Sequence, residues 1–248
     1  MVMTNTTDSD LVEIWAAFVD WPRRKAGEAG FIKRNLAKHG CRSVYDLCVG
    51  GGFDSIELLL AGFDVTSNEV DDAFLELAKR NAERRGVALS ITRYDWRELP
   101  PEPKFDSAIM LGNSFIYVQD PVEHQKIVRN VYDLLNPGGV FIIDRRNFEY
   151  IFSERDEILR GNFKYSRRFV YCGDYVDGRP VGIGDNGVLF EYLDKRTGRK
   201  YNILHYPVME DELNALLRRV GFRDVQTYYD YEEKKPAHHD FTQHVAIK

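Results

Sequence analysis

Short apolar segments alternate with amphipathic segments between residues 43 and 144, and this alternation constrains the fold more than any other feature of the chain. In the amphipathic segments the apolar residues recur every three or four positions, which is typical of helices. Strands that alternate with helices form βαβ units and place the strands side by side in a parallel sheet. We therefore expect a doubly wound α/β fold, with strands at 43–48, 63–67, 88–94, 105–111 and 139–144 and helices at 53–60, 71–85 and 121–135.

Different patterns flank this core. The region 10–39 has helical spacing, and Trp21-Pro22 interrupts it, which favours two helices. After the core, residues 161–206 alternate aromatic and polar side chains and predict an inserted antiparallel cap. Its turn signals are Asp177-Gly178, Asp185-Asn186-Gly187 and Arg196-Thr197-Gly198. A final helix at 209–220 and strands at 223–231 and 242–247 complete a mostly parallel, seven-stranded sheet.

The composition of the 248 residues excludes several classes of protein. Asp and Glu outnumber Lys and Arg by 39 to 34, so the net charge of −5 offers no basic surface for nucleic acid. The longest apolar run, at 58–63, is far shorter than the roughly 18–20 residues that a membrane span needs. The first residues lack the basic and apolar parts of a signal peptide, and Cys41, Cys48 and Cys172 show no CxxC spacing. We expect a cytoplasmic protein with reduced thiols and without membrane or nucleic-acid partners.

A glycine cluster follows the first expected strand. Asp46 lies in that strand, and Gly50 to Gly52 form the turn into the next helix. Glycine at such a turn lets the backbone approach a ligand and adopt a positive φ without a clash at Cβ. Glu69 follows the second strand, where a carboxylate can accept both ribose hydroxyls. Asp95-Trp96 follow the third strand, where an acid can meet an adenine amino group and an indole can pack on the ring.

The spacing of the glycines discriminates between adenosine cofactors. A dinucleotide turn has the pattern G-x-G-x-x-G, and here the third glycine position holds Ser55. The pyrophosphate of NAD is therefore disfavoured, and a dehydrogenase is the least supported class of enzyme. S-adenosylmethionine, which carries adenosine without a pyrophosphate, is the expected cofactor, and S-adenosylhomocysteine is then the product.

Several longer motifs resemble those of the glycine N-methyltransferases and of the glycine/sarcosine methyltransferases that make betaine. They are Leu111-Gly-Asn-Ser-Phe115, Ile143-Asp-Arg-Arg-Asn147 with Tyr150, and His205-Tyr-Pro207, together with 39–41 and 65–67. The similarity spans residues 12–222 and implies a class I methyltransferase fold. The expected organisation is a single domain, 1–248, composed of a helical segment at 1–40, a cofactor-binding core at 41–147, a substrate cap at 148–208 and a closing helix and strands at 209–248.

The resemblance implies a role for each matching position. Arg24 resembles the arginine that holds the methionine carboxylate of the cofactor, and the other cofactor positions are Asp46, Gly50, Gly52, Glu69, Asp95, Trp96 and Leu111. Arg146 resembles the residue that grips an amino-acid carboxylate, and Asn113 the residue that orients the molecule. The tyrosines that line the methyl-transfer pocket correspond to Tyr165, Tyr192 and Tyr206. The implied reaction is N-methylation of a small amino acid or related amine, of the glycine, sarcosine or dimethylglycine type.

These residue types suit methyl transfer from a sulfonium. An arginine fork binds a carboxylate through two hydrogen bonds and leaves the amine nitrogen free to face the methyl group. Tyrosine rings suit methyl groups and a cationic centre. Such a transfer needs alignment and exclusion of water more than acid–base groups. Arg145 alternates to the opposite face of the strand from Arg146, so we expect Arg145 to be structural.

Two features depart from the family. No tyrosine precedes Tyr45, and Phe18 stands where one is expected. The amino-terminal arm is short, whereas the family carries an acidic arm that reaches into a neighbouring subunit. These departures favour a roomier or already methylated amine, and they make a homo-oligomer compatible with the sequence without requiring it. Alternatives are a natural-product methyltransferase for a larger amine or hydroxyl, and an S-adenosylmethionine-binding module without turnover.

Three histidines near the carboxyl end are candidate metal ligands. His238 and His239 belong to a polar stretch, 232–240, that is typical of an exposed connection between the last two strands, and His244 follows it. No rigid element gives the three histidines the spacing of metal ligands. We therefore expect no metal.

Overall fold

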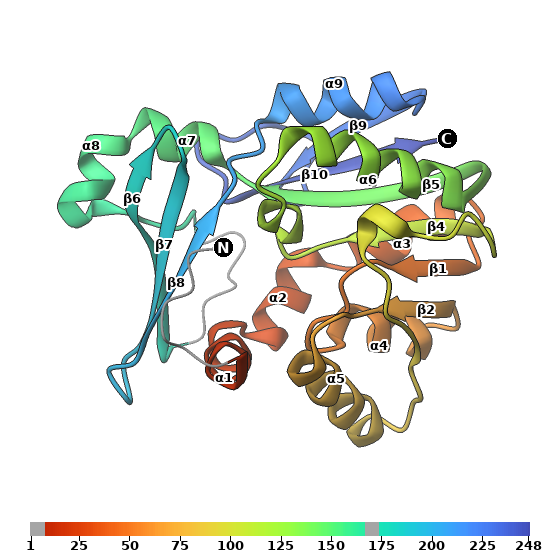
Figure 1. Ribbon diagram of the computed structural model, residues 1–248, viewed down its shortest axis with the longest axis horizontal. Helices are drawn as coiled ribbons and strands as arrows, with labels where there is room; N and C mark the ends of the chain where they lie inside the picture. The colour runs from red at the N-terminus through yellow and green to blue at the C-terminus, as the bar shows by residue number, and fades with distance from the viewer. Residues whose placement is uncertain (1–7, 167–173) are drawn as a thin grey trace.

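The computed structural model describes residues 8–166 and 174–248, so Cys172 lies outside the described residues (Figure 1). The helices are α1 (Asp8–Phe18), α2 (Trp21–Glu28), α3 (Phe31–Lys38), α4 (Phe53–Leu60), α5 (Asp72–Arg84), α6 (Pro121–Leu134), α7 (Phe148–Ser153), α8 (Arg155–Glu157) and α9 (Glu210–Val220), with short helical turns η1 (Trp96–Glu98), η2 (Ser114–Tyr117) and η3 (Ile158–Asn162). The strands are β1 (Ser43–Asp46), β2 (Asp64–Asn68), β3 (Ser90–Thr92), β4 (Phe105–Met110), β5 (Leu135–Arg146), β6 (Val176–Gly184), β7 (Gly187–Asp194), β8 (Lys200–His205), β9 (Asp224–Tyr229) and β10 (Phe241–Ile247). None of the helices in these two ranges is long and apolar enough to cross a membrane.

Seven strands form one sheet in the order β3-β2-β1-β4-β5-β10-β9. The strands from β3 to β5 run parallel to their neighbours, and β10 runs antiparallel to both β5 and β9. The strand order reverses between β1 and β4. In an open α/β sheet such a reversal leaves a crevice at the carboxyl ends of the strands, where ligands bind. The expected mostly parallel seven-stranded sheet is confirmed.

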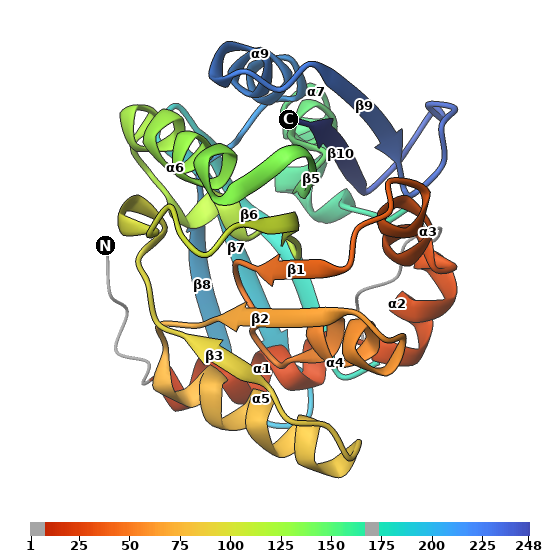
Figure 2. The same cartoon turned by 90° about the vertical axis from the view of Figure 1, so that its right-hand side faces the viewer.

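Helices lie on both sides of the large sheet (Figure 2). Alternate side chains of its central strands pack against one layer or the other. On β5, Phe141 and Ile143 pack with residues of α6 and α9, whereas Val140 and Ile142 pack with residues of α3 and α4. This alternation follows from the two-residue period of a strand. Burial on both faces also explains why these strands are continuous apolar runs in the sequence.

A second sheet of three antiparallel strands, β6-β7-β8, stands beside the large sheet in Figure 1. It packs on α1 and α7 through a buried cluster that includes Phe18, Phe148 and Phe190. Two of its three expected turns are present, since β7 is separated from β6 by residues 185–186 and from β8 by residues 195–199. The inserted antiparallel cap is therefore confirmed as well.

The third expected turn, Asp177-Gly178, is wrong. Both residues lie inside β6 and pair with Leu193 and Tyr192 of β7. A Cβ on Gly178 would lie 2.9 Å from the ring of Tyr192 and 3.0 Å from the ring of Phe18. The glycine therefore serves the close approach of two aromatic rings to the strand, which is the other common reason for glycine in a strand.

The structure has three helices before β1, where the sequence predicts two. Pro22 lies in the first turn of α2, and the carboxylate of Asp20 caps that helix by accepting the amide of Arg23 at 3.0 Å. The proline therefore begins a helix instead of interrupting one. The additional break falls at Ala29-Gly30, where φ is 48° and 75° and the helical path ends.

The boundaries of β3 and β5 differ most from expectation. β3 covers Ser90–Thr92 alone, because it lies at the edge of the sheet and pairs with β2 only. β5 begins at Leu135, four positions earlier than predicted, because the chain passes from α6 directly into a strand that pairs with β4. The carboxyl ends shift by two residues, from 94 to 92 in β3 and from 144 to 146 in β5.

The connection between β9 and β10 is exposed at 232–235, as expected, but its end is buried. His239 is 3% exposed, and its Nε2 lies 3.2 Å from Oγ1 of Thr242. The carboxylate of Asp230 accepts the amides of Asp240 and Phe241 at 2.9–3.1 Å. These hydrogen bonds fold the end of the connection back onto the sheet, so His239 is buried while His238 stays partly exposed.

The buried histidine of β10 should make the stability of the protein depend on pH. His244 is fully buried, and burial lowers its pKa from 6.5 to about 3. The unfolded chain binds a proton at this group near pH 6.5 while the folded chain does not, so stability is lost as the pH falls below 6.5. Between pH 7.5 and 5, we expect the wild type to lose about 2 kcal/mol more unfolding free energy than His244→Gln. Urea titrations at both values measure this, and equal losses would contradict it.

Candidate active site

The glycine turn after β1 packs closely against α5. Gly50 and Gly52 have φ of 51° and 85°. A Cβ on Gly52 would lie 3.2 Å from Ala78, so α5 leaves no space for a side chain there. The amide of Gly50 donates a hydrogen bond of 3.1 Å to Oε2 of Glu69. The structure therefore brings these two glycines and Glu69 together at the carboxyl ends of β1 and β2.

Asp46 points into the protein. It is 2% exposed, and its carboxylate accepts the hydroxyl of Ser55 at 2.7 Å and the amide of Cys48 at 3.2 Å. Burial raises the pKa of Asp46 to about 7. These hydrogen bonds tie the glycine turn to α4, so Asp46 braces the turn; its contact with the cofactor stays a prediction.

Glu69 is held in one orientation by the backbone. Its carboxylate accepts the amides of Gly50, Val70 and Asp71 at 3.0–3.1 Å. Burial raises the pKa of this half-buried carboxyl. A carboxylate has about four acceptor sites, so a fourth direction remains for a sugar hydroxyl. An acceptor beside glycines without side chains fits the ribose of an adenosine cofactor.

Asp95 and Trp96 follow β3 as expected, and each has a partner in the protein. The side chain and amide of Arg97 bind the carboxylate of Asp95 and lower the pKa of Asp95 to about 2. The indole Nε1 of Trp96 donates to the carbonyl of Leu47 at 2.7 Å, and its ring packs against the core on the α6 side of the sheet. Trp96 therefore covers the end of β1, while the adenine contacts of both residues stay predictions.

The two acids make a testable contrast. Glu69 is predicted to bind the ribose, and its carboxylate also holds the glycine turn. We therefore expect Glu69→Ala to weaken S-adenosylhomocysteine binding by about a hundredfold. Asp95→Ala should weaken it by less than about tenfold, because that carboxylate is already engaged by Arg97 and partly exposed. Calorimetric Kd values for both variants measure the contrast, and equal losses would contradict it.

The loop after β4 is joined to the end of β5 by buried hydrogen bonds. Asn113 has a φ of 61°, and its side-chain Oδ1 accepts the backbone amide of Arg146 at 2.8 Å. The backbone amide of Asn113 donates to the carboxylate of Asp144 at 2.6 Å. The amide of Gly112 also donates to Asp144, at 3.1 Å. Leu111, which precedes it, is buried in the core. Asn113 therefore sets the backbone position of Arg146. Sequence reasoning missed Asp144, although an acid next to two arginines at a strand end was the available signal.

Arg146 is buried among aromatic rings. Its Cζ lies 4.6 Å from the centre of the Phe190 ring, 4.8 Å from that of Phe241 and 5.7 Å from that of Tyr165. Ring faces attract a guanidinium and exclude water, which strengthens any hydrogen bond that the cation makes to an anion. Sequence reasoning missed Phe190, although the aromatic alternation of the cap was the available signal. Nothing in the sequence placed Phe241 of β10 beside it.

Arg145 faces away from this aromatic group, as predicted. Its side chain lies 2.8 Å from Glu149 and 3.5 Å from Glu210. It also donates to the carbonyl groups of Arg146 and Val208, both at 3.1 Å. Arg145 therefore ties β5 to α7 and α9 and has a structural role.

The three predicted tyrosines do not lie together. Tyr165 donates to the carbonyl of Gly178 at 2.8 Å, near Arg146. Tyr192 is 1% exposed, and its ring meets Phe18 edge-on at 5.0 Å. Tyr206, which follows β8, instead packs edge-on against His124 of α6, with 4.8 Å between the ring centres. The structure brings Tyr165 and Tyr192 into the aromatic group of Arg146 and leaves Tyr206 outside it.

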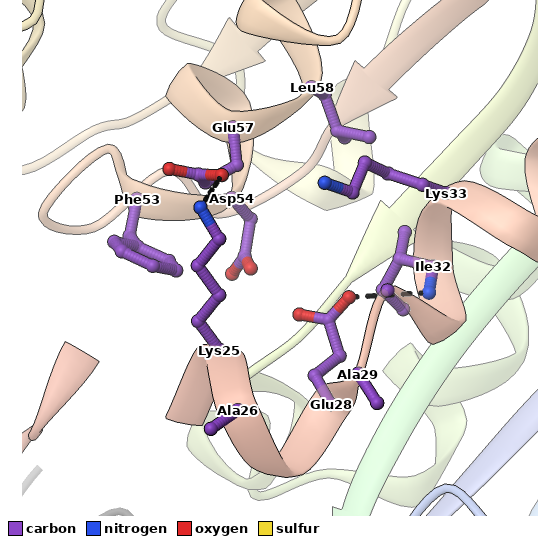
Figure 3. A pocket seen from close by; sticks show the side chains of 11 residues that line it. Lys25, Ala26, Glu28, Ala29, Ile32, Lys33, Phe53, Asp54, Glu57 and Leu58 are labelled. Atoms are coloured by element: carbon purple, nitrogen blue, oxygen red, sulfur yellow. Dashed lines mark hydrogen bonds and ion pairs between the residues drawn. The ribbon is translucent and has the colours of Figure 1, made fainter. Parts of the chain in front are cut away.

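Arg24 of α2 is buried and pairs with Asp54 in the first turn of α4 at 2.8 Å. A cavity of about 340 Å³ lies beside this pair, between α2, α3 and α4 (Figure 3). In Figure 3 the carboxylates of Glu28 and Asp54 point into it, and Lys25 pairs with Glu57 at 2.6 Å. Within the described part of the chain, no predicted site residue lines this cavity. The role of Arg24 toward the methionine carboxylate stays a prediction.

Comparisons with known proteins agree with this geometry. Residues 44–139 match a family model described as a methyltransferase domain. The solved structure of an S-adenosylmethionine-dependent methyltransferase from Clostridium acetobutylicum has a TM-score of 0.70 to this fold, covers 96% of this chain and 97% of that chain, and is 17% identical. The family model therefore points to a methyltransferase, and the structural likeness shows that the two proteins share a fold.

Curated relatives narrow the class to a family. The glycine/sarcosine N-methyltransferase of Aphanothece halophytica is 34% identical over 243 residues, which cover 96% of this chain and 88% of that protein. The glycine/sarcosine/dimethylglycine N-methyltransferase of Actinopolyspora halophila is 32% identical over 96% of this chain and 41% of its own length. The chain belongs to the glycine/sarcosine N-methyltransferase family, and the resemblance found in its motifs is confirmed.

Proposed function

We propose that the protein transfers a methyl group to the nitrogen of a small amine that bears a carboxylate, of the glycine, sarcosine or dimethylglycine type. The observation that carries this proposal is Arg146, a buried cation surrounded by aromatic rings at the carboxyl end of β5. A guanidinium in such surroundings is suited to a single small anion. The names of the curated relatives support the same class of substrate.

Each residue of the site has a distinct task in this reaction. S-adenosylmethionine, when bound, supplies a methyl group on a positively charged sulfur. Glu69 and the glycine turn hold the adenosine end, and Arg24 holds the carboxylate at the methionine end. Arg146 binds the substrate carboxylate, so that the neutral amine nitrogen is free to face the methyl group. The rings of Tyr165 and Tyr192 accommodate the positive charge that the nitrogen acquires.

The side chains that pack on Tyr192 favour an acceptor that already carries a methyl group. Trp15 and Phe18 of α1 contact the ring of Tyr192 at 5.6 Å and 5.0 Å between ring centres. Phe18 supplies no hydroxyl that could bind an N–H group of the amine. We therefore infer that sarcosine or dimethylglycine is a better acceptor than glycine.

The organisation of the chain follows from this assignment. We infer that residues 1–248 work as one domain, in which the core 41–147 binds the cofactor and the cap 148–208 covers the substrate. The segment 1–40 and the segment 209–248 complete this domain. We further infer that the protein acts in the cytoplasm, and a homo-oligomer is compatible with this arrangement.

Methyl transfer to a panel of amines tests the proposal. The panel contains glycine, sarcosine, dimethylglycine, other small amino acids, larger amines and amines without a carboxylate, and mass spectrometry identifies the products. We expect methylated product from small carboxylate-bearing amines. Turnover of only the larger amines would replace this assignment with that of a natural-product methyltransferase, and cofactor binding without any turnover would indicate a non-catalytic module.

A further inference from the structure

His205, at the end of β8, shares one face of the smaller sheet with Phe190. The register pairs His205 with Val188 and Ile203 with Phe190, so His205 and Phe190 are diagonal neighbours across two antiparallel strands. Their rings stack at 4.4 Å between centres with an angle of 11° between planes. His205 is 1% exposed, so water does not loosen this stack.

The same Phe190 ring also contacts the guanidinium of Arg146, whose Cζ lies 4.6 Å from the ring centre. His205 and Arg146 therefore rest on one shared ring, although they come from different sheets. Burial, and then the charge of Arg146, hold the pKa of His205 well below its usual value, so the imidazole is neutral. A neutral ring can lie close to this cation, whereas an imidazolium would repel it.

His205 also reaches Tyr192, whose hydroxyl lies 3.5 Å from its Nε2. Phe190 and Tyr192 stack at 6.1 Å between centres. The imidazole is thus in contact with the ring that supports Arg146 and with a tyrosine of the same aromatic group. Asn113 fixes the backbone of Arg146, and the Phe190 ring lies against its guanidinium.

We propose that His205 is a positioning residue: its neutral imidazole packs on Phe190 and thereby fixes the direction in which Arg146 offers its N–H groups to a substrate carboxylate. The inference rests on the proposed function, because it takes Arg146 as the carboxylate-binding group. His205 itself needs no contact with substrate or cofactor. A flat ring of similar size should replace it, and a small side chain should not.

The kinetic test compares His205→Ala with His205→Phe. We expect His205→Ala to raise KM for the carboxylate-bearing amine by about tenfold, to change kcat less, and to leave the Kd of S-adenosylhomocysteine within about twofold of the wild type. His205→Phe should return KM to within about threefold of the wild type. His244→Gln, at another buried histidine, is the matched control and should lower Tm without changing KM. An unchanged KM in His205→Ala, or no rescue by phenylalanine, would overturn the proposal.

A second readout does not depend on turnover. The Nε–H resonance of Arg146, assigned with Arg146→Lys, reports the order of the guanidinium in the complex with S-adenosylhomocysteine. We expect it to shift or broaden in His205→Ala and to return in His205→Phe; an unchanged resonance in His205→Ala would overturn the positioning role. If no carboxylate-bearing amine is methylated, the proposed function fails, and this resonance alone then decides the role of His205.

Discussion

Arg146→Ala is expected to lower kcat/KM for a carboxylate-bearing amine by about a hundredfold to a thousandfold. Arg146 is 4% exposed and its guanidinium lies against Phe190 and Phe241, so water does not replace the lost hydrogen bonds to the carboxylate. Loss of one partner from such a buried charge pair typically costs about 2–5 kcal/mol of binding. The loss should fall on KM and on kcat together, because a loosely held amine also faces the methyl group less often.

Binding of the cofactor separates this effect from misfolding. The glycine turn and Glu69 lie at the ends of β1 and β2, whereas Arg146 lies at the end of β5, so the Kd of S-adenosylhomocysteine should stay within about threefold of the wild type. Arg84→Ala, on the exposed face of α5, is the control for the loss of an arginine and should leave kcat/KM unchanged. Steady-state kinetics and calorimetry on the three proteins measure this. An Arg146→Ala enzyme with nearly full activity would show that the carboxylate is held elsewhere.

The second large effect concerns stability. Arg145→Ala is expected to lower the unfolding free energy by about 2–4 kcal/mol, because Arg145 is 1% exposed and satisfies two backbone carbonyl groups and two carboxylates at once. Its removal leaves the carbonyl oxygens of Arg146 and Val208 without that donor. The expected loss of unfolding free energy is smaller than for a fully buried ion pair, because Glu149 is 37% exposed and can be hydrated.

Urea unfolding of Arg145→Ala and of Arg84→Ala measures this difference. Arg84 is exposed on α5, and surface substitutions of this kind usually change stability by less than about 0.5 kcal/mol. If both variants lost the same small amount, Arg145 would not be the tie between β5, α7 and α9 that its contacts indicate. A lower cofactor affinity is not expected in either variant.

The sequence was sufficient to predict the large sheet, because its signals are local. The segments that became β4 and β5 contain apolar runs that are buried on both faces. The glycine turn and Glu69 stand at strand ends, which a parallel sheet brings together. Arg145 and Arg146 separated onto opposite faces for the same reason, the two-residue period of a strand. The boundaries of β3 and β5 were less predictable, since they depend on pairing with neighbours.

The substrate side depends on contacts between distant segments, and here the sequence was insufficient. Phe241 of β10 and Phe190 of β7 meet at Arg146, although fifty positions separate them. Asp177-Gly178 has the composition of a turn, but the rings of Tyr192 and Phe18 require the glycine within a strand. Tyr206 turned toward His124 while its neighbour His205 took the place beside Phe190, and a pattern of alternating aromatics does not reveal which of two adjacent rings faces the site.

The comparison of two substrates that share a nitrogen tests the central claim most directly. Sarcosine and dimethylamine both present a secondary amine, and only sarcosine carries a carboxylate for Arg146. The account predicts that kcat/KM of the wild-type enzyme with S-adenosylmethionine is at least about a hundredfold higher for sarcosine. Equal values for the two amines would contradict it, because the buried guanidinium would then have no part in choosing the substrate.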